Sequence, residues 1–192
     1  MPASEILVKR RLVFLSSFYC HGISTAPKYT KRKDNRMSAR FLVRRVRASD
    51  IDQILKIEHL SFGKDAYDRN LFAEYLHKCG QFFLAVELDR KLCGYMITCP
   101  RGQRLPATAE IISIAVDPAA RREGAGSALM DSTLRRLRLR GIGRLILMVK
   151  VTNRKARTFY EKYGFRKLRI VRRYYEDGAD GWLMVRNSVA PV

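Results

Sequence analysis

One short stretch of the chain combines the residue types that bind a diphosphate. An apolar segment at residues 109–116 is followed by Arg121, Arg122, Gly124 and Gly126, and then by an amphipathic segment that predicts a long helix. The start of a helix offers unpaired N–H groups and the positive end of the helix dipole. Glycines let a phosphate approach the backbone closely, and arginines add complementary charge. We therefore expect a diphosphate site here; a helix start with glycines and no ligand is the alternative.

Two common phosphate-binding motifs do not fit this stretch. A Walker loop requires Gly-Lys-Ser/Thr at its end, and no such tripeptide follows Gly126. The dinucleotide fingerprint requires the spacing G-x-G-x-x-G, which fails here, and a predicted hairpin precedes the strand. The site is therefore predicted to belong to another class of phosphate-binding fold.

The elements that must position this loop follow from hydrophobic periodicity. Strands are predicted over residues 41–46, 81–87, 92–98, 109–116, 144–151, 166–172 and 182–186, and helices over residues 50–60, 70–78, 124–140 and 154–162. Ser49 is a candidate N-cap, Asp89-Arg90 a hairpin turn, and Gly164 a helix stop. This order predicts an α/β domain of the α+β type, with a central mixed sheet.

Length and charge bound the possible functions. The chain has 192 residues, which suits one domain with a tail, and its 38 Lys/Arg against 18 Asp/Glu give a net charge of +20. Residues 1–37 differ in composition, and we expect a basic extension that lies outside the domain at residues 38–192 or an over-long start before Met37; a targeting or tethering tail is the alternative. No apolar run is long enough to predict a membrane span.

The cysteines and histidines predict no metal centre. Cys20, Cys79, Cys93 and Cys99 form no CxxC pair, and the three histidines are scattered. Free thiols suit a reducing compartment, so we expect a cytoplasmic protein.

The motif Arg121-x-x-Gly124-x-Gly126 resembles the acyl-CoA pyrophosphate loop of the GNAT superfamily, and the resemblance extends over residues 41–186. It implies a GNAT acyl-CoA N-acyltransferase fold, in which a twisted mixed sheet is flanked by helices, and an acetyl-CoA-dependent N-acetyltransferase. In that family the strand before the loop pairs with the pantetheine arm and the next parallel strand diverges. The implied cofactor-binding residues are Ile114, Ala115, Val116, Arg121, Arg122, Glu123, Gly124, Ala125, Gly126 and Ser127.

A second segment resembles the family's N-x-x-A-x-x-x-Y-E-x-x-G-F motif. It begins at Asn153 and contains Tyr160. The resemblance implies that Asn153 contacts the cofactor and that Tyr160 is the acid that protonates the leaving thiolate. Tyr160 also belongs to an apolar stripe with Ala156, Phe159 and Tyr163, so a purely structural role is the alternative.

The general base is less directly indicated. The sequence is most similar to ribosomal-protein-alanine and other protein N-terminal acetyltransferases, but Met148 stands where those enzymes carry their glutamate base. Glu110 lies six residues before Val116, an offset similar to that of the base of GNAT histone acetyltransferases. A carboxylate beside an apolar sheet should have a raised pKa, which suits a base. Glu110 is thus the candidate base; a solvent-facing glutamate at a strand end is the alternative.

The acceptor is predicted from the segment between the last two strands. Tyr174 and Tyr175 precede Asp177-Gly178, and the segment is similar to one that covers the peptide in protein N-terminal acetyltransferases. Its carboxylates could also attract a cationic amine. A peptide or protein α-amine is the expected substrate; a small amine, a catalytically impaired acyl-CoA-binding module and an ordinary polar hairpin are the alternatives. The basic surface suits anionic partners such as a ribosome, or else is simply solvated.

Overall fold

A computed structural model describes residues 41–102 and 107–187 of the chain. The predictions for residues 1–37 lie outside these ranges. Seven strands form one open sheet in the order β1-β2-β3-β4-β5-β7-β6. The strands are β1 (Phe41–Arg45), β2 (Phe83–Leu88), β3 (Lys91–Arg101), β4 (Thr108–Val116), β5 (Arg144–Lys150), β6 (Arg166–Val171) and β7 (Gly181–Asn187), and the helices are α1 (Ile51–Phe62), α2 (Arg69–Cys79), α3 (Ala125–Leu139) and α4 (Arg154–Lys162).

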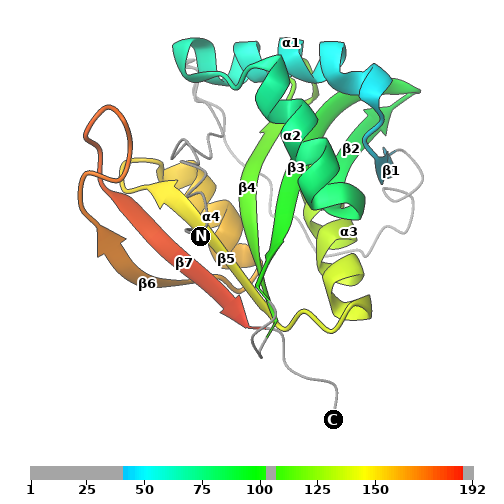
Figure 1. The fold of residues 1–192 in the computed structure, drawn as a ribbon. Coiled ribbons are helices and arrows are strands. Elements are labelled where there is room, and N and C mark those ends of the chain that lie inside the picture. The colour runs from blue at the N-terminus through cyan, green and yellow to red at the C-terminus, as the bar shows by residue number, and fades with distance from the viewer. Residues whose placement is uncertain (1–40, 103–106, 188–192) are drawn as a thin grey trace, which may run out of the picture.

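The sheet is mixed, as the sequence predicts. Only β4 and β5 pair in parallel, and every other neighbouring pair in the sheet is antiparallel. In Figure 1 β4 and β5 meet at one end and diverge toward the end of the molecule that carries α1. The expected GNAT-type arrangement, a twisted mixed sheet flanked by helices, is confirmed.

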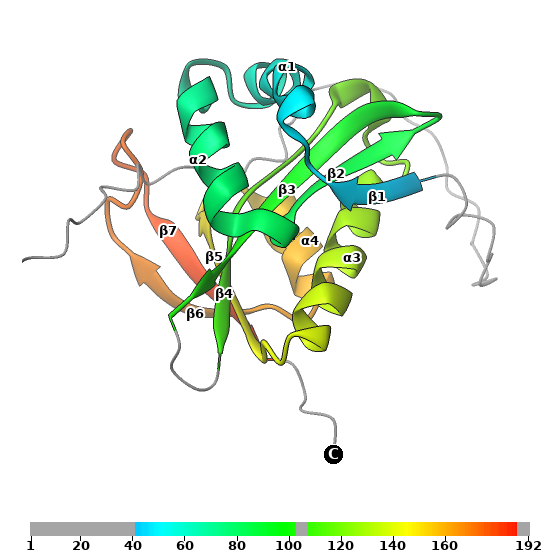
Figure 2. The ribbon, with the colours of Figure 1, turned by 45° about the vertical axis from the view of Figure 1, so that its right-hand side comes forward.

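Helices cover both faces of the sheet, so the core has two layers. One hydrophobic cluster joins α3 and α4 to the sheet through residues such as Leu129, Ala156 and Tyr160. The other joins α1 and α2 to β2, β3 and β4 through Ile54 and Phe72 among others. Figure 2 shows α2 in front of the sheet and α4 behind it. A side chain on β4 therefore belongs to one of two chemically separate compartments.

A buried carboxylate fixes the connection between α1 and α2. Glu58 on α1 is 1% exposed and accepts hydrogen bonds from the Tyr67 N–H, at 2.8 Å, and from the Tyr95 hydroxyl. The same Tyr95 hydroxyl lies 3.0 Å from Ser113 Oγ on β4. A buried carboxylate needs such partners, and they tie α1 and its following loop to β3 and β4.

Two local predictions are wrong. Ser49 does not cap α1, because it lies inside a 3₁₀ turn, Ala48–Asp50, and Asp50 organises this entry instead. Asp50 accepts a hydrogen bond of 2.7 Å from the Arg47 N–H and pairs with the Arg44 guanidinium at 2.7 Å. The thiols of Cys79 and Cys99 are not free, since the two residues form a disulfide with a Cα–Cα separation of 4.8 Å.

No helix in the described ranges is long and apolar enough to cross a membrane.

Candidate active site

The strands β4 and β5 part in the middle of the sheet. Thr108 to Ile111 pair with Arg144 to Leu147, and beyond that point β4 pairs only with β3 and β5 only with β7. A β-bulge marks the parting point, because Ile97 opposes Ser113 while Thr98 opposes Ile111, which leaves Ile112 as the extra residue. The backbone of residues 112–116 therefore has no strand partner on the side of β5.

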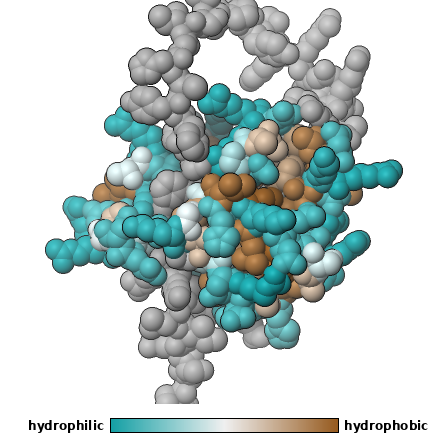
Figure 3. Space-filling view, turned by 90° about the horizontal axis from the view of Figure 1, so that it is seen from above, coloured by the Kyte–Doolittle hydropathy of each residue, from teal (hydrophilic) through white to brown (hydrophobic). Residues whose placement is uncertain are grey.

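This unpaired edge fits the arm of an acyl-CoA. The predicted cofactor residues Ile114, Ala115 and Val116 all lie on it, and their side chains are buried in the two cores. Antiparallel pairing with β3 uses the backbone groups of every second residue, and the Val116 carbonyl accepts from Arg121 Nε. The remaining N–H and C=O groups of this edge point toward β5 and can bind a ligand, since a buried backbone group requires a partner. Figure 3 looks onto the end of the molecule where the strands diverge and shows apolar side chains gathered within a hydrophilic ring.

The predicted diphosphate loop follows β4 directly. A 3₁₀ turn, Pro118–Ala120, leads to Arg122 and Gly124, which have φ angles of 66° and 103°. The first helical hydrogen bond of α3 runs from the Ala128 N–H to the Gly124 carbonyl, at 2.9 Å. The N–H groups of residues 125–127 therefore point out of the helix start without intrahelical partners. This is the arrangement that binds a diphosphate.

Gly126 leaves open space on this surface. A Cβ atom at Gly126 would lie 3.8 Å from Phe159 Cζ and 3.9 Å from Val116 Cγ2, which are ordinary contacts. The protein itself therefore does not require glycine at this position. Phe159 also places α4 directly beside the loop, and the Tyr163 hydroxyl donates to the Ser127 carbonyl at 3.3 Å.

The two arginines of the loop differ in environment. Arg121 donates from Nε to the Val116 carbonyl at 3.0 Å and lies 3.3 Å from Ser61 Oγ, so it braces the loop against β4 and α1. Burial lowers the pKa of Arg121. Arg122 is exposed at the rim beside the half-buried Glu123. The structure thus leaves Arg122, more than Arg121, available for an anionic ligand.

Two tyrosine hydroxyls are buried without a partner. Tyr160 is 0% exposed and Tyr175 is 3% exposed, and within the described ranges neither hydroxyl has a hydrogen-bond partner. Burial raises the pKa of both, and the pKa of Tyr175 is raised further by Tyr174 and Tyr160. Tyr160 packs in the core against Phe165, at 5.6 Å between ring centroids, so the predicted apolar stripe is real. The Tyr160 hydroxyl still requires a hydrogen-bond partner, which an atom of a bound ligand could provide.

Asn153 caps the helix that carries Tyr160. Its Oδ1 atom accepts a hydrogen bond of 3.0 Å from the Ala156 N–H at the start of α4. Asn153 is 9% exposed. It therefore orients α4 relative to β5 in addition to any contact with a cofactor.

Glu110 lies on the opposite face of the sheet from Tyr160. It is 9% exposed and opposes Cys99 on β3, one residue before the pairing between β4 and β5 ends at Ile111. Burial raises the pKa of Glu110, whereas Arg101, whose Nε atom lies 2.5 Å from Glu110 Oε2, acts in the other direction. The contact is an ion pair between the Arg101 guanidinium and the Glu110 carboxylate. Glu110 is thus a partly desolvated carboxylate, not a solvent-facing one.

Residues that the sequence did not single out complete this side. Tyr75 on α2 is 3% exposed, and its pKa is raised to about 12, chiefly by burial and then by Glu74, Glu110 and Tyr174. Tyr75 is therefore near enough to Glu110 and Tyr174 to interact with them electrostatically. In the sequence it is simply one member of the apolar stripe of α2, which also buries Phe72 and Cys79.

The β6–β7 segment is held by ion pairs. Lys150 Nζ lies 2.5 Å from Asp177 Oδ2 and 5.3 Å from the centre of the Tyr175 ring, and Arg172 pairs with Asp180 at 2.7 Å. The Lys150 hydrogen bond lowers the pKa of Asp177. Two of the carboxylates expected to attract an amine are thus already neutralised, and they position Tyr175 instead.

Met148 packs near Tyr174 and Tyr175. A Cβ atom at Gly181 would lie 2.7 Å from Met148 Cε and 3.3 Å from both Tyr174 Cβ and Tyr175 Cε2. Met148 is 7% exposed. A glutamate at this position would project into the same apolar surroundings.

Among the described residues, no group of three or more His, Cys, Asp and Glu side chains could hold a metal ion.

Comparison with known proteins agrees with this geometry. An N-alpha-acetyltransferase of Sulfurisphaera tokodaii is 32% identical over 75% of this chain and 91% of the relative. The crystal structure of Ard1 from Thermoplasma volcanium has a TM-score of 0.73 and 27% identity, covering 78% of this chain and 98% of that chain. The ribosomal-protein-S18-alanine N-acetyltransferase of Escherichia coli has a TM-score of 0.68 and 27% identity, covering 79% and 96%.

The sequence pattern of the acetyltransferase (GNAT) family matches residues 48–165, which include the diverging strands, the loop before α3 and Tyr160. The chain therefore belongs to the GNAT family, as an N-acetyltransferase that uses acetyl-CoA.

Proposed function

We propose that this enzyme acetylates the α-amino group of a peptide or protein N-terminus, with Glu110 as the base and Tyr160 as the acid. The observation that carries this proposal is the pair of buried hydroxyls, Tyr160 and Tyr175, which lack partners in the described part of the chain. The names of the similar proteins, an N-alpha-acetyltransferase and a ribosomal-protein-alanine N-acetyltransferase, support the choice of acceptor.

Residues on the two faces of the sheet have different roles, because one face binds the acetyl donor and the other binds the acceptor amine. When bound, acetyl-CoA supplies an acetyl group activated as a thioester. The N–H groups of residues 125–127 and the backbone of residues 112–116 hold the donor on one side of the parting strands. Tyr160 lies on the same side, in the core shared with α3 and α4, where its hydroxyl can donate a proton to the leaving sulfur.

The acceptor amine is handled from the other face. Glu110 accepts a proton from the ammonium group at a carboxylate oxygen, and its burial makes it a stronger base than an exposed glutamate. Tyr75 is buried and near enough to interact electrostatically with Glu110, and its ring would help to exclude water from the amine. Tyr175, held beside Lys150 and its partner Asp177, packs near Met148 on this face.

The acceptor class is tested by steady-state turnover of acetyl-CoA. The panel contains peptides with a free N-terminus, the same peptides with a blocked N-terminus and an internal lysine, and small amines such as a polyamine and an amino sugar. We expect turnover only with free N-terminal peptides, and a large loss of that turnover in Tyr160→Phe. Faster turnover with a small amine would transfer the assignment to that class. No turnover with any amine, despite acetyl-CoA binding, would indicate a binding module.

We further propose that the enzyme works in the cytoplasm, because acetyl-CoA is an intracellular metabolite. The Cys79–Cys99 disulfide is the observation that weighs against this location, since thiols stay reduced there. Alkylation of intact cells before lysis, followed by mass spectrometry, tests it. Alkylated Cys79 and Cys99 would agree with a reducing compartment, and a bonded pair would place the enzyme in an oxidising one.

A further inference from the structure

Basic residues also concentrate in two segments that follow the diphosphate loop along the chain. Residues 135–144 contain five arginines and no acidic residue, and residues 154–173 contain nine Lys/Arg and one glutamate. The two segments form the end of α3, all of α4 and the strand β6, which lies at the edge of the described sheet. This charge is independent of the identity of the acceptor amine.

The arrangement forms a continuous belt, which we define by Arg138, Lys162, Arg166, Lys167, Arg169 and Arg186. Within the described ranges only Lys167 of these six lies within ion-pair distance of a carboxylate, at 3.2 Å from Glu161. That pair is well exposed and contributes little stability. Holding like charges together without counter-ions costs stability, unless an anionic partner neutralises them.

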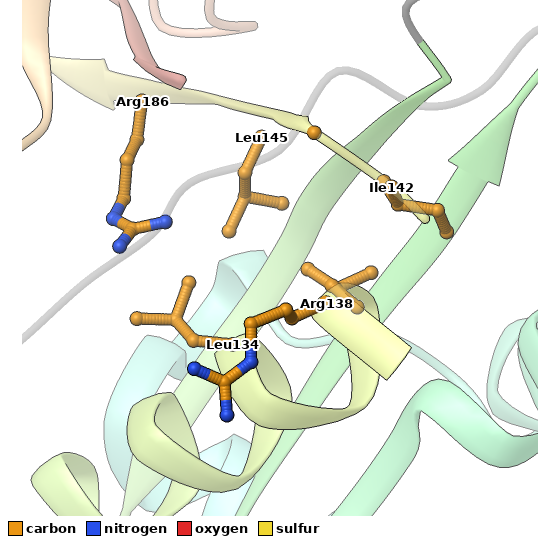
Figure 4. A pocket seen from close by; sticks show the side chains of 7 residues that line it. Leu134, Arg138, Ile142, Leu145 and Arg186 are labelled. Carbon is orange, nitrogen blue, oxygen red and sulfur yellow. The ribbon is translucent and has the colours of Figure 1, made fainter. Parts of the chain in front are cut away.

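The belt is hollowed between Arg138 and Arg186. A shallow pocket is lined by Leu134, Ile142 and Leu145 together with Arg138 and Arg186, as Figure 4 shows. The Nε atom of Arg186 donates to the Tyr163 carbonyl at 2.8 Å, which holds its guanidinium at the end of α4. Two guanidinium groups over an apolar floor suit a phosphate attached to a flat or apolar group.

The strand β6 carries the belt around the edge of the sheet. Lys167 opposes Met184, whose side chain lies in the core beneath α4, whereas Arg166 and Arg169 oppose residues of the other face. Basic side chains therefore project on both sides of the strand edge. A flat membrane surface can contact only one side, whereas a flexible polymer can wrap around both. A strand of six residues is about 20 Å long, enough for several consecutive phosphates.

The composition of the belt favours nucleic acid over other polyanions. Four of its six members are arginines, whose planar fork binds phosphate in a bidentate manner. Trp182 lies under Lys167, at 5.7 Å from its Nζ atom to the ring centre, and Leu168 and Ile170 are 52% and 36% exposed on the same strand. Apolar and aromatic surface interleaved with positive charge is typical of single-stranded nucleic acid sites.

We propose that this belt is a docking surface for RNA, separate from the catalytic site. It holds the enzyme on an RNA-containing substrate or assembly through phosphate contacts, without reading the base sequence. The inference goes beyond the proposed function, because it does not depend on which amine is acetylated.

The test measures RNA binding directly. Fluorescence anisotropy of a labelled oligouridylate of about twenty nucleotides is recorded with the wild-type protein and with Arg166→Glu/Arg169→Glu. We expect the wild type to bind, and to lose about 50-fold in affinity between about 50 mM and about 200 mM salt if four phosphates are contacted. The double variant should bind at least tenfold more weakly, with a salt dependence that is shallower by about 1.4 in logarithmic slope.

A matched control changes the same charge elsewhere. Arg90→Glu/Lys91→Glu alters two exposed residues at the β2–β3 turn and should bind RNA nearly as well as the wild type. Circular dichroism and turnover with a short peptide should be unchanged in both variants, which would separate this result from the fate of the proposed acceptor.

Three results would overturn the proposal: no binding of the oligouridylate by the wild type, an equal loss in the control variant, or tighter binding to polyglutamate or to phosphatidylserine vesicles than to RNA.

Discussion

A single methyl group at position 126 should separate the stability of this protein from its affinity for acetyl-CoA. Gly126 lies in the first turn of α3 and its φ angle is compatible with any residue, unlike the angle of 103° at Gly124. The nearest protein atom to an added Cβ would be 3.8 Å away. Gly126→Ala therefore introduces no strain, and the neighbouring residues have no need to move.

The two expected effects have opposite signs. Replacing a helical glycine by alanine stabilises a protein by up to about 1 kcal/mol, which for a domain of this size raises Tm by about 2–4 °C. A diphosphate at the helix start must approach the N–H groups to hydrogen-bond distance, and the methyl group occupies that space. Loss of one hydrogen bond to a charged group costs about 1.5–3 kcal/mol, which weakens acetyl-CoA binding about 10- to 150-fold.

Calorimetric titration with acetyl-CoA and a thermal melt measure both quantities on the same samples. Gly143→Ala is the matched control, because a Cβ there meets nothing within 4 Å and the residue lies away from the helix start. It should leave the affinity unchanged. If Gly126→Ala binds acetyl-CoA as tightly as the wild type, the diphosphate is not bound at the start of α3. A fall in Tm of several degrees would show instead that the fold needs glycine at this position.

Four further changes test the rest of the site. Tyr160→Phe should lower kcat about 10²–10⁴-fold with little change in acetyl-CoA affinity, and an unchanged kcat would remove its hydroxyl from the reaction. Burial raises the pKa of Glu110, so its stabilising contribution is present at pH values below the unfolded pKa and is lost as pH rises through the folded pKa. The change in Tm caused by Glu110→Gln, relative to the wild type, should therefore be more favourable at neutral pH than at acidic pH. The same substitution should abolish the rise of kcat/KM with pH. A pH profile identical to that of the wild type would contradict the role of Glu110 as base. Met148→Glu should increase turnover of N-terminal peptides if a carboxylate there can share the role, and no change would leave Glu110 as the only candidate. Cys79→Ser should lower the unfolding free energy of the oxidised protein by about 3 kcal/mol but leave that of the dithiothreitol-treated protein unchanged. Equal losses in both samples would show that the packing of the Cys79 side chain, and not its disulfide with Cys99, is the cause.

Periodicity predicts the elements of this chain well, because each segment has one dominant pattern. The helix over residues 154–162 is found at the same bounds, and the strand over residues 109–116 begins one residue earlier. The family resemblance predicts the parting of β4 from β5, whereas the order of the strands in the sheet is not predicted, since no local pattern encodes which strands pair or diverge. The bulge at Ile112 lies inside an unbroken apolar run and leaves no mark in the sequence.

The site was harder to predict where function depends on pairing across the chain. Lys150 and Asp177 are 27 residues apart, and neither has a local pattern that indicates an ion pair. The sequence alone therefore suggests that the carboxylates of the β6–β7 segment attract the amine, whereas in the structure Asp177 pairs with Lys150 and Asp180 pairs with Arg172. The disulfide between Cys79 and Cys99 is not predicted for the same reason, because the two residues come together only when α2 packs on β3.

The two faces of the sheet separate the proposed acid, Tyr160, from the proposed base, Glu110, so that they do not neutralise each other. Tyr160 is buried among apolar side chains on the α3–α4 face, where burial raises its pKa and keeps its proton in place. Glu110 is on the α1–α2 face, with Arg101 at 2.5 Å opposing the effect of burial and favouring the ionised form. The sheet lies between the two groups, and β4 and β5 no longer pair beyond Ile111 and Leu147. A thioester and an amine that meet where the strands part would each lie near one of these groups, which is the condition for the proposed acid to act on the sulfur and the proposed base on the amine in the same encounter.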